Sequence, residues 1–121
     1  MSTQSYQDLV VWQRAMQLVK LIYELTKRLP TDERYALSSQ MQRAAVSIPS
    51  NIAEGYERNS RKEYVRFLSI AKGSNSELRT QLQIIIDIKY VTEEDVREVV
   101  EISNEVGKML RSLMKKLYPT P

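Results

Sequence analysis

Lysine and arginine side chains in two short stretches are the groups in this sequence whose type and spacing most clearly indicate a chemistry. The stretches are "ERNSRKEYVR", residues 57–66, and "RSLMKKL", residues 111–117. Basic side chains that lie close together bind anions, and phosphate groups above all. The candidate anion-binding residues are therefore the basic side chains of both stretches: Arg58, Arg61, Lys62, Arg66, Arg111, Lys115 and Lys116.

The same sequence offers little for catalysis. It contains no His and no Cys, so it lacks an imidazole base, a thiolate nucleophile and the Glu-x-x-His ligands of di-metal helical bundles. It has no glycine-rich phosphate loop. The acidic residues 93–95 are explained by the start of a helix, where carboxylates favour the positive end of the dipole. We expect no enzyme, no metal site and no cofactor.

Composition favours a few long helices. With 42% hydrophobic and 27% charged residues the chain resembles an ordinary globular domain, and only 3 Gly and 4 Pro in 121 residues leave few turn signals. We expect one domain, residues 1–121. The absence of Cys and of a signal-like or membrane-spanning apolar run predicts a cytoplasmic protein without disulfides.

Apolar residues recur at helical spacing over four segments, residues 8–28, 34–58, 61–89 and 93–117. The first segment has two apolar stripes, one from Leu9 to Tyr23 and one from Val11 to Leu29. Ser60 with Glu63, and Thr92 with Asp95, have the spacing of helix N-caps. Four such helices joined by short turns predict an all-α, antiparallel up-down-up-down four-helix bundle.

Pro49 lies inside the second segment, where a proline costs about 3 kcal/mol. The apolar spacing keeps its phase across this residue, so we favour a continuous helix kinked at Pro49. The alternative is a break, with Ser47 or Ser50 capping a second short helix.

Gly55, Gly73 and Gly107 fall one each within the last three helices. A glycine in a helix interior costs about 1 kcal/mol relative to alanine. We expect these glycines to mark close approach between helix backbones, although Gly55 as a C-cap is an alternative.

A polar stripe runs along the second helix at spacings of three and four residues. Its members are Arg43, Ser47, Asn51, Glu54 and, at the far end, Arg58. Such a stripe is either solvated surface or a buried hydrogen-bond network near Pro49 or at a subunit contact.

Residues 43–82, "RAAVSIPSNIAEGYERNSRKEYVRFLSIAKGSNSELRTQL", resemble the bacterial four-helix bundle proteins encoded in intervening sequences of large-subunit ribosomal RNA genes. "DLVVWQRA" and "LPTDERYALSSQMQRAA" extend the resemblance over nearly the whole chain. The resemblance implies an antiparallel bundle that assembles as a ring-like homopentamer. More remotely, the chain is similar to the accessory variability determinant proteins of diversity-generating retroelements, which bind nucleic acid and a reverse transcriptase.

The end of the third helix is apolar around its whole circumference, which also indicates an assembly. A bundle helix needs only one apolar stripe for its own core, so another subunit is the simplest cover. The alternative is packing under the turn between the third and fourth helices of one chain. The predicted interface residues are Leu82, Ile84, Ile86, Ile88, Tyr90 and Val91.

An up-down bundle would bring the seven basic candidates to one end, against Asp8, Glu54, Glu57 and Glu63. The net charge of the chain, +3, and its pI of about 9.2 are only mildly basic, so this uneven distribution matters more than the total. Tyr56, Tyr64 and Tyr118 lie near in sequence and are candidates for stacking on unpaired bases. The alternative is that the cations complement helix dipoles and the tyrosines belong to the core.

Two functions are consistent with these features. The first is a non-catalytic homo-oligomer that binds nucleic acid, preferably RNA, through the basic end without base-specific readout, beside a polymerase-type partner such as a reverse transcriptase. The second is a protein-interaction scaffold with no role in nucleic-acid binding. Neither involves a membrane.

Overall fold

A computed structural model describes residues 5–117, and all regular structure in that range is helical. The long helices are α1 (Val10–Thr26), α2 (Leu37–Tyr56), α3 (Arg61–Asp87) and α4 (Arg97–Leu117). Three short 3-10 turns precede α1, α2 and α4, namely η1 (Tyr6–Asp8), η2 (Thr31–Glu33) and η3 (Glu94–Val96). The predicted all-α class with four helices is confirmed, and no helix in the described range is long and apolar enough to cross a membrane.

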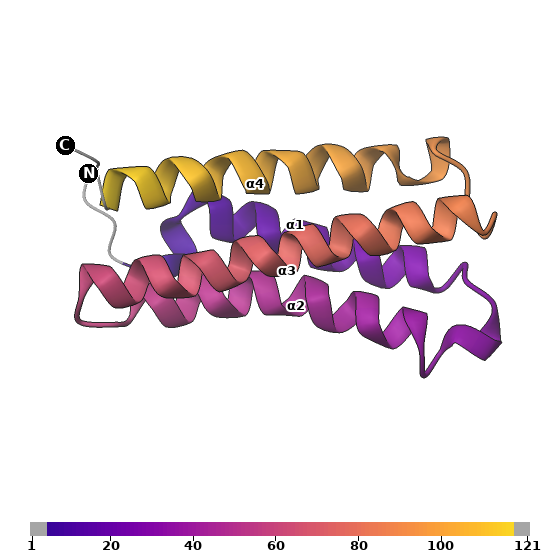
Figure 1. Ribbon diagram of the computed structural model, residues 1–121, viewed down its shortest axis with the longest axis horizontal. Helices are drawn as coiled ribbons and strands as arrows, with labels where there is room; N and C mark the ends of the chain where they lie inside the picture. The colour runs from indigo at the N-terminus through magenta and orange to yellow at the C-terminus, as the bar shows by residue number, and fades with distance from the viewer. Residues whose placement is uncertain (1–4, 118–121) are drawn as a thin grey trace.

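The four helices lie side by side, and consecutive helices are joined at alternate ends of the bundle (Figure 1). The α1–α2 and α3–α4 connections lie at one end, and the α2–α3 connection lies at the other. Each helix packs against two neighbours, because α1 and α3 both contact α2 and α4. The end of α2, the start of α3 and the end of α4 therefore share one end of the molecule.

One apolar stripe on each helix fills the core. On α1 this is the stripe that begins at Val11 and includes Leu18 and Ile22, both fully buried. The second stripe of α1 stays outside the core at Met16 and Tyr23, which are exposed. Burial of apolar area, worth about 25 cal/mol per Å², thus fixes the rotation of α1 about its own axis.

Capping side chains explain where α3 and α4 begin. Ser60 Oγ accepts a hydrogen bond of 3.0 Å from the Glu63 backbone N–H, and α3 starts at Arg61 as predicted. The Thr92 N–H donates to Asp95 Oδ2 (2.8 Å) and the Asp95 N–H donates to Thr92 Oγ1 (3.2 Å). The hydrogen bond from the Thr92 backbone N–H, then the Thr92 side chain and then Arg28 lower the pKa of the Asp95 carboxyl. The η3 turn begins at this cap, and α4 follows the turn, so α4 starts at Arg97 rather than at residue 93.

Five other helix ends also differ from the prediction by two or three residues, whereas α4 ends at Leu117 as predicted. α1 and α2 start at Val10 and Leu37, a few residues after the 3-10 turns η1 and η2, and they end at Thr26 and Tyr56. α3 ends at Asp87, two residues before Lys89, whose φ of 67° is left-handed and cannot continue a helix. Apolar periodicity cannot distinguish these 3-10 turns from the first turn of an α-helix.

α2 runs without interruption through Pro49, so the alternative of two separate helices is wrong. Neither Ser47 nor Ser50 begins a helix. Ile48 and Ile52, on either side of the proline, are fully buried, and their burial offsets the lost hydrogen bond. A bend of α2 at Pro49 stays a prediction.

The three glycines have different surroundings. A Cβ on Gly55 would lie 2.8 Å from the Phe67 Cβ, and one on Gly107 would lie 3.3 Å from Asn75 Nδ2, so both positions are close contacts with α3. Gly55 belongs to the last turn of α2 and its φ is not positive, so it is not the C-cap. No described atom lies within 4 Å of a Cβ built on Gly73. The prediction that Gly73 marks a close approach between two helix backbones is therefore wrong within one chain.

The Gly55 contact yields a stability prediction. Gly55→Ala should lower the free energy of unfolding by about 1 to 3 kcal/mol, because the added methyl group overpacks against Phe67. Helix propensity alone predicts the opposite, a gain of up to about 1 kcal/mol. Urea unfolding followed by circular dichroism measures the difference, with Ser69→Ala on the exposed face of α3 as the control. A Gly55→Ala protein as stable as the wild type would contradict the close contact.

Candidate nucleic-acid interface

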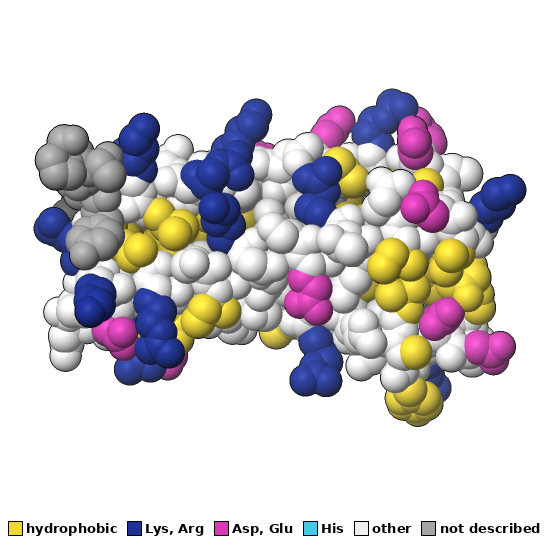
Figure 2. Space-filling model, in the orientation of Figure 1, with side chains coloured by type: hydrophobic (Ala, Val, Ile, Leu, Met, Phe, Trp, Pro, Cys, Tyr) yellow, Lys and Arg dark blue, Asp and Glu magenta, His cyan; other side chains and the backbone are white. Residues whose placement is uncertain are grey.

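The seven basic candidates lie at the end of the bundle that holds the α2–α3 connection, and all seven are exposed. α4 ends at this same end, so Lys115 and Lys116 join Arg61 and Lys62 there. Figure 2 shows most of the Lys and Arg side chains of this face over that half of the molecule, and most of the Asp and Glu side chains over the other half. We call the region that these seven residues form the basic end.

Two of these arginines have carboxylate partners. Arg58 Nη2 lies 2.8 Å from Glu54 Oε1, and Arg66 Nη1 lies 3.6 Å from Glu63 Oε2. Exposed pairs of this kind contribute only about 0 to 1 kcal/mol, but they cancel part of the local charge. The other five candidates have no ion pair with any residue of the described range.

An aromatic ring orients the paired arginines. The guanidinium carbons of Arg58 and Arg66 lie 4.8 Å and 5.9 Å from the centroid of the Phe67 ring. Cations over an aromatic face are attracted by its quadrupole. Phe67 is itself held against Gly55. The close contact between α2 and α3 therefore positions two basic side chains at the surface.

Two tyrosines near the basic end pack against each other and are only partly exposed to solvent. Tyr56 and Tyr64 meet edge to face, with ring centroids 6.0 Å apart and an interplanar angle of 82°. Both are half-buried, and Tyr64 packs against the core. Burial, and to a lesser extent the neighbouring Tyr56, raises the pKa of the Tyr64 hydroxyl to about 12. Tyr118 lies outside the described residues.

The polar stripe of α2 divides into a half-buried centre and exposed ends. Ser47 Oγ and Ser74 Oγ of α3 are 2.8 Å apart. Asn51 Nδ2 donates to the Ser47 carbonyl oxygen (2.8 Å) and to Ser47 Oγ (2.9 Å). This network lies between α2 and α3 beside Pro49, whereas Arg43 and Glu54 are exposed.

The six predicted interface residues do not form one surface. Leu82 and Val91 are only 1% and 6% exposed and belong to the core of the single chain, which leaves them unavailable to another subunit. Ile86 and Tyr90 are partly buried against the same core. Ile84 and Ile88 remain 41% and 48% exposed. Much of the apolar end of α3 is therefore covered within one chain, because α4 and the α3–α4 connection pack over it.

Tyr90 also ties two connections together at that end. Its hydroxyl donates to Glu33 Oε2 of η2 at 2.7 Å, and this hydrogen bond is the main reason why the pKa of Tyr90 is raised. Arg28 Nη2, in the connection that follows α1, lies 3.1 Å from Asp95 Oδ1.

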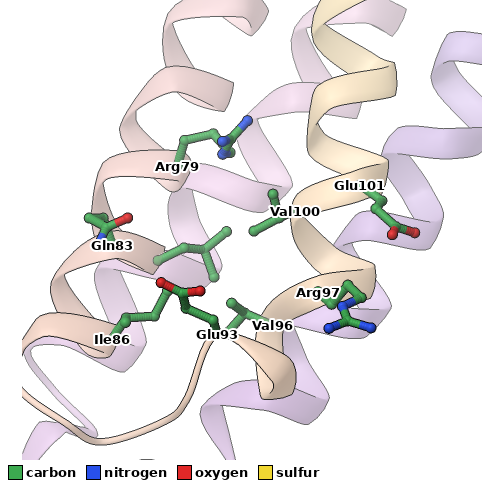
Figure 3. Close-up of a pocket in the computed structure, with 9 residues that line it drawn as sticks. Arg79, Gln83, Ile86, Glu93, Val96, Arg97, Val100 and Glu101 are labelled. Carbon is green, nitrogen blue, oxygen red and sulfur yellow. The ribbon is translucent and has the colours of Figure 1, made fainter.

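A groove of about 320 Å³ lies between α3 and α4 near their connection. Figure 3 shows Ile86, Val96 and Val100 between the two helices, with Arg79 pointing from α3 toward α4. Glu93 and Glu101 balance Arg79 and Arg97 around this groove. Its lining holds no nucleophile paired with a base, and no residues of the described range form a group of three or more acidic side chains able to hold a metal ion.

A second groove between α3 and α4, of about 360 Å³, lies nearer the basic end. We call it the α3–α4 polar groove, and its lining consists of Asn75, Ser76, Arg79, Ser103, Asn104, Gly107, Lys108 and Arg111. Arg111 is one of the candidates from the sequence, whereas Arg79 and Lys108 were not predicted. The available signal was the recurrence of Lys108, Arg111 and Lys115 on one face of α4.

Comparison with known proteins identifies relatives over most of the chain. A model of the 23S rRNA-intervening sequence protein family matches residues 7–112. Among solved structures, the chain is similar to a protein of unknown function from the S23 ribosomal protein family of Bacteroides thetaiotaomicron, with a TM-score of 0.81 and 29% identity over 88% of this chain and 99% of that one. No curated protein matches.

The environment of Tyr64 predicts an ultraviolet titration. One tyrosine should ionise near pH 12, and Tyr64→Phe should remove that component. Because the pKa in the folded state lies above the unfolded value of about 10, the associated stability is complete below pH 10 and is lost as the pH rises through 12. Tyr35→Phe, at a site 86% exposed, is the control that leaves the component in place. A wild-type titration that is complete by about pH 11 would contradict this placement.

Proposed function

The chain belongs to the 23S rRNA-intervening sequence protein family, and we propose that it is a non-catalytic homo-oligomer that binds nucleic acid through its basic end. Four exposed cations that form no ion pair within residues 5–117 support this proposal most directly: Arg61 and Lys62 from the start of α3, and Lys115 and Lys116 from the end of α4. The family description refers to ribosomal RNA, which favours RNA over DNA as the ligand. Such a ligand also favours a cytoplasmic location.

Binding of this kind uses phosphate contacts. Each phosphate neutralised by Lys or Arg releases counterions, so affinity comes from the number of contacts and falls as salt rises. Phosphate contacts position a protein without reading sequence. The exposed side chains at the basic end are lysines and arginines on flexible stems, which suits recognition of the backbone rather than of individual bases.

Assembly would multiply these contacts. Ile84 and Ile88 share an exposed face of α3 with Ile70 and Gly73, since their positions repeat at helical spacing. The open space above Gly73 gives a helix of a second copy room to approach. A ring of five, as the resemblance to the rRNA-encoded bundles implies, would present five basic ends together. A polymerase-type protein, such as a reverse transcriptase, is the additional partner implied by the more remote resemblance.

Charge reversal at the basic end tests the ligand. Arg61→Glu with Lys62→Glu should lower the affinity for fluorescently labelled RNA by roughly tenfold or more near 0.1 M salt, because two or more phosphate contacts are lost. The fold should persist, since acidic residues are favourable in the first turn of a helix. Fluorescence anisotropy at several salt concentrations measures both the affinity and its salt dependence.

The matched control is Lys27→Glu with Arg34→Glu, which changes the charge equally near the opposite end of the bundle. This control should retain RNA binding. RNA binding that does not depend on salt concentration, or that both variants weaken equally, would contradict the proposal.

Charge introduced on the outer face of α3 tests the assembly. Ile84→Glu with Ile88→Glu should convert the oligomer into monomers, because it would bury two unpaired carboxylates in the contact between copies. Sedimentation velocity measures the mass in solution. Val10→Glu with Tyr35→Glu, at two other exposed apolar sites, is the control and should keep the oligomer. A wild-type protein that is monomeric at every concentration would rule out this part of the proposal.

A further inference from the structure

Uncancelled positive charge distinguishes the α3–α4 polar groove. Lys108 and Arg111 are exposed on α4, and among residues 5–117 neither has a carboxylate within ion-pair distance. No Asp or Glu of the described range lines this groove. By contrast, Arg14 of α1 lies 3.0 Å from Glu105, on a different face of α4. Lys108 and Arg111 are therefore two groove cations to which residues 5–117 supply no ion-pair partner.

Arg79 extends across the groove from α3. It is partly buried, and its Nη1 donates a hydrogen bond to Asn104 Oδ1 of α4. A guanidinium has five N–H donors in a fixed fork, and this bond uses one of them. Asn104 thus holds the guanidinium in place while other donors remain for a bound oxyanion.

The floor of the groove is a polar pair and a glycine. Ser103 Oγ donates to Asn75 Oδ1 at 2.7 Å, and Asn75 Nδ2 donates to the Ser103 carbonyl oxygen at 3.0 Å. These two side chains are buried, and each hydrogen bonds to the other residue. A Cβ on Gly107 would lie 3.3 Å from Asn75 Nδ2 and 3.6 Å from Arg111 Nη1. The glycine therefore leaves a hollow beneath the Arg111 guanidinium that any other residue would fill.

The cations of the groove continue toward the basic end. Lys115 follows Arg111 by one helical turn on the same face of α4. From Asn104 to Lys115 the helix rises by roughly 16 Å, and Lys108, Arg111 and Lys115 are spaced by about 4.5 to 6 Å along it. Figure 2 shows Lys and Arg side chains over α3 and α4 along this side of the bundle. A row of cations suits a chain of phosphates better than a single anion.

We propose that the α3–α4 polar groove is a phosphate-binding site. Arg79 and Arg111 supply forked donors to phosphate oxygens, and Lys108 supplies a point charge between them. The phosphates come either from the backbone of a nucleic-acid strand or from a free polyphosphate, such as the triphosphate of a nucleotide. The spacing of the cations favours the strand. The choice of a nucleic-acid strand as the source of the phosphates rests on the function proposed above. A strand in the groove would extend the contact surface from the basic end along the side of the bundle.

Removal of two groove cations tests the site with RNA. The variant Arg79→Gln with Lys108→Gln alters none of the seven cations of the basic end and leaves the buried floor unchanged. Near 0.1 M salt its affinity for labelled single-stranded RNA should fall roughly 10- to 30-fold, and the slope of log K against log salt should become shallower by about 1.4, because each contact to a single strand contributes about 0.7. Lys20→Gln with Lys27→Gln, the same change in charge on α1 and its end, should change the affinity by less than about twofold.

A variant without a change in charge adds a second test. Gly107→Ala fills the hollow beside Arg111 and should also weaken RNA binding. If binding depended on the net charge of the surface alone, this variant would bind RNA like the wild type. Nuclear magnetic resonance then locates the ligands, since titration with RNA and, separately, with inorganic tripolyphosphate should shift the backbone amides of residues 104–111. Circular dichroism of each variant shows whether the bundle remains folded.

The outcomes separate the two proposals. If the groove variant binds RNA like the wild type while Arg61→Glu with Lys62→Glu weakens binding, the groove does not hold a nucleic-acid strand and the basic end stands. If tripolyphosphate shifts residues 104–111 but RNA binds nowhere, the groove is a site for free polyphosphate and the proposed function fails. If neither ligand shifts these amides, the groove assignment is overturned.

Discussion

Burial of one apolar stripe on each helix sets the direction of every other side chain in this bundle. Leu18, Ile48, Leu78 and Val106 are fully buried on α1, α2, α3 and α4 in turn. A helix has about 3.6 residues per turn, so fixing one face fixes all the others. With Leu78 in the core, the next residue, Arg79, faces α4 and its groove. The positions of the surface cations are therefore consequences of packing between the helices.

Small and polar residues set how closely the helices approach and in which register. Gly55 lets α2 approach Phe67 of α3. The guanidinium groups of two arginines at the basic end lie over the Phe67 ring. On the other side of α3, the buried pair of Asn75 and Ser103 links α3 to α4. A shift along the helix axes would leave both groups unpaired, at a cost of about 1 to 3 kcal/mol each. Packing and hydrogen bonding together therefore fix the positions of the helices, and so of the backbone sites from which these cations extend.

The sequence predicts features that depend on local spacing and misses those that depend on helix rotation. Four amphipathic segments, the Ser60 cap of α3 and the continuity of α2 through Pro49 follow from local pattern, and the family resemblance is confirmed. Burial of Leu82 and Val91 was not predicted, because an apolar run alone does not show which side a neighbouring helix covers. The α3–α4 polar groove was missed for the same reason: Arg79 and Lys108 lie 29 residues apart and meet only after packing.

Nucleic acid should contact the basic end and the α3–α4 polar groove, and not the opposite end of the bundle, where the α3–α4 connection lies (Figure 1). Crosslinking of the wild-type protein to RNA containing 4-thiouridine, followed by mass spectrometry of the modified peptides, locates that contact directly. The account predicts crosslinks within residues 57–66 and 104–117. Crosslinks confined to residues 87–101, or their complete absence under conditions in which a known RNA-binding protein is labelled, would contradict it.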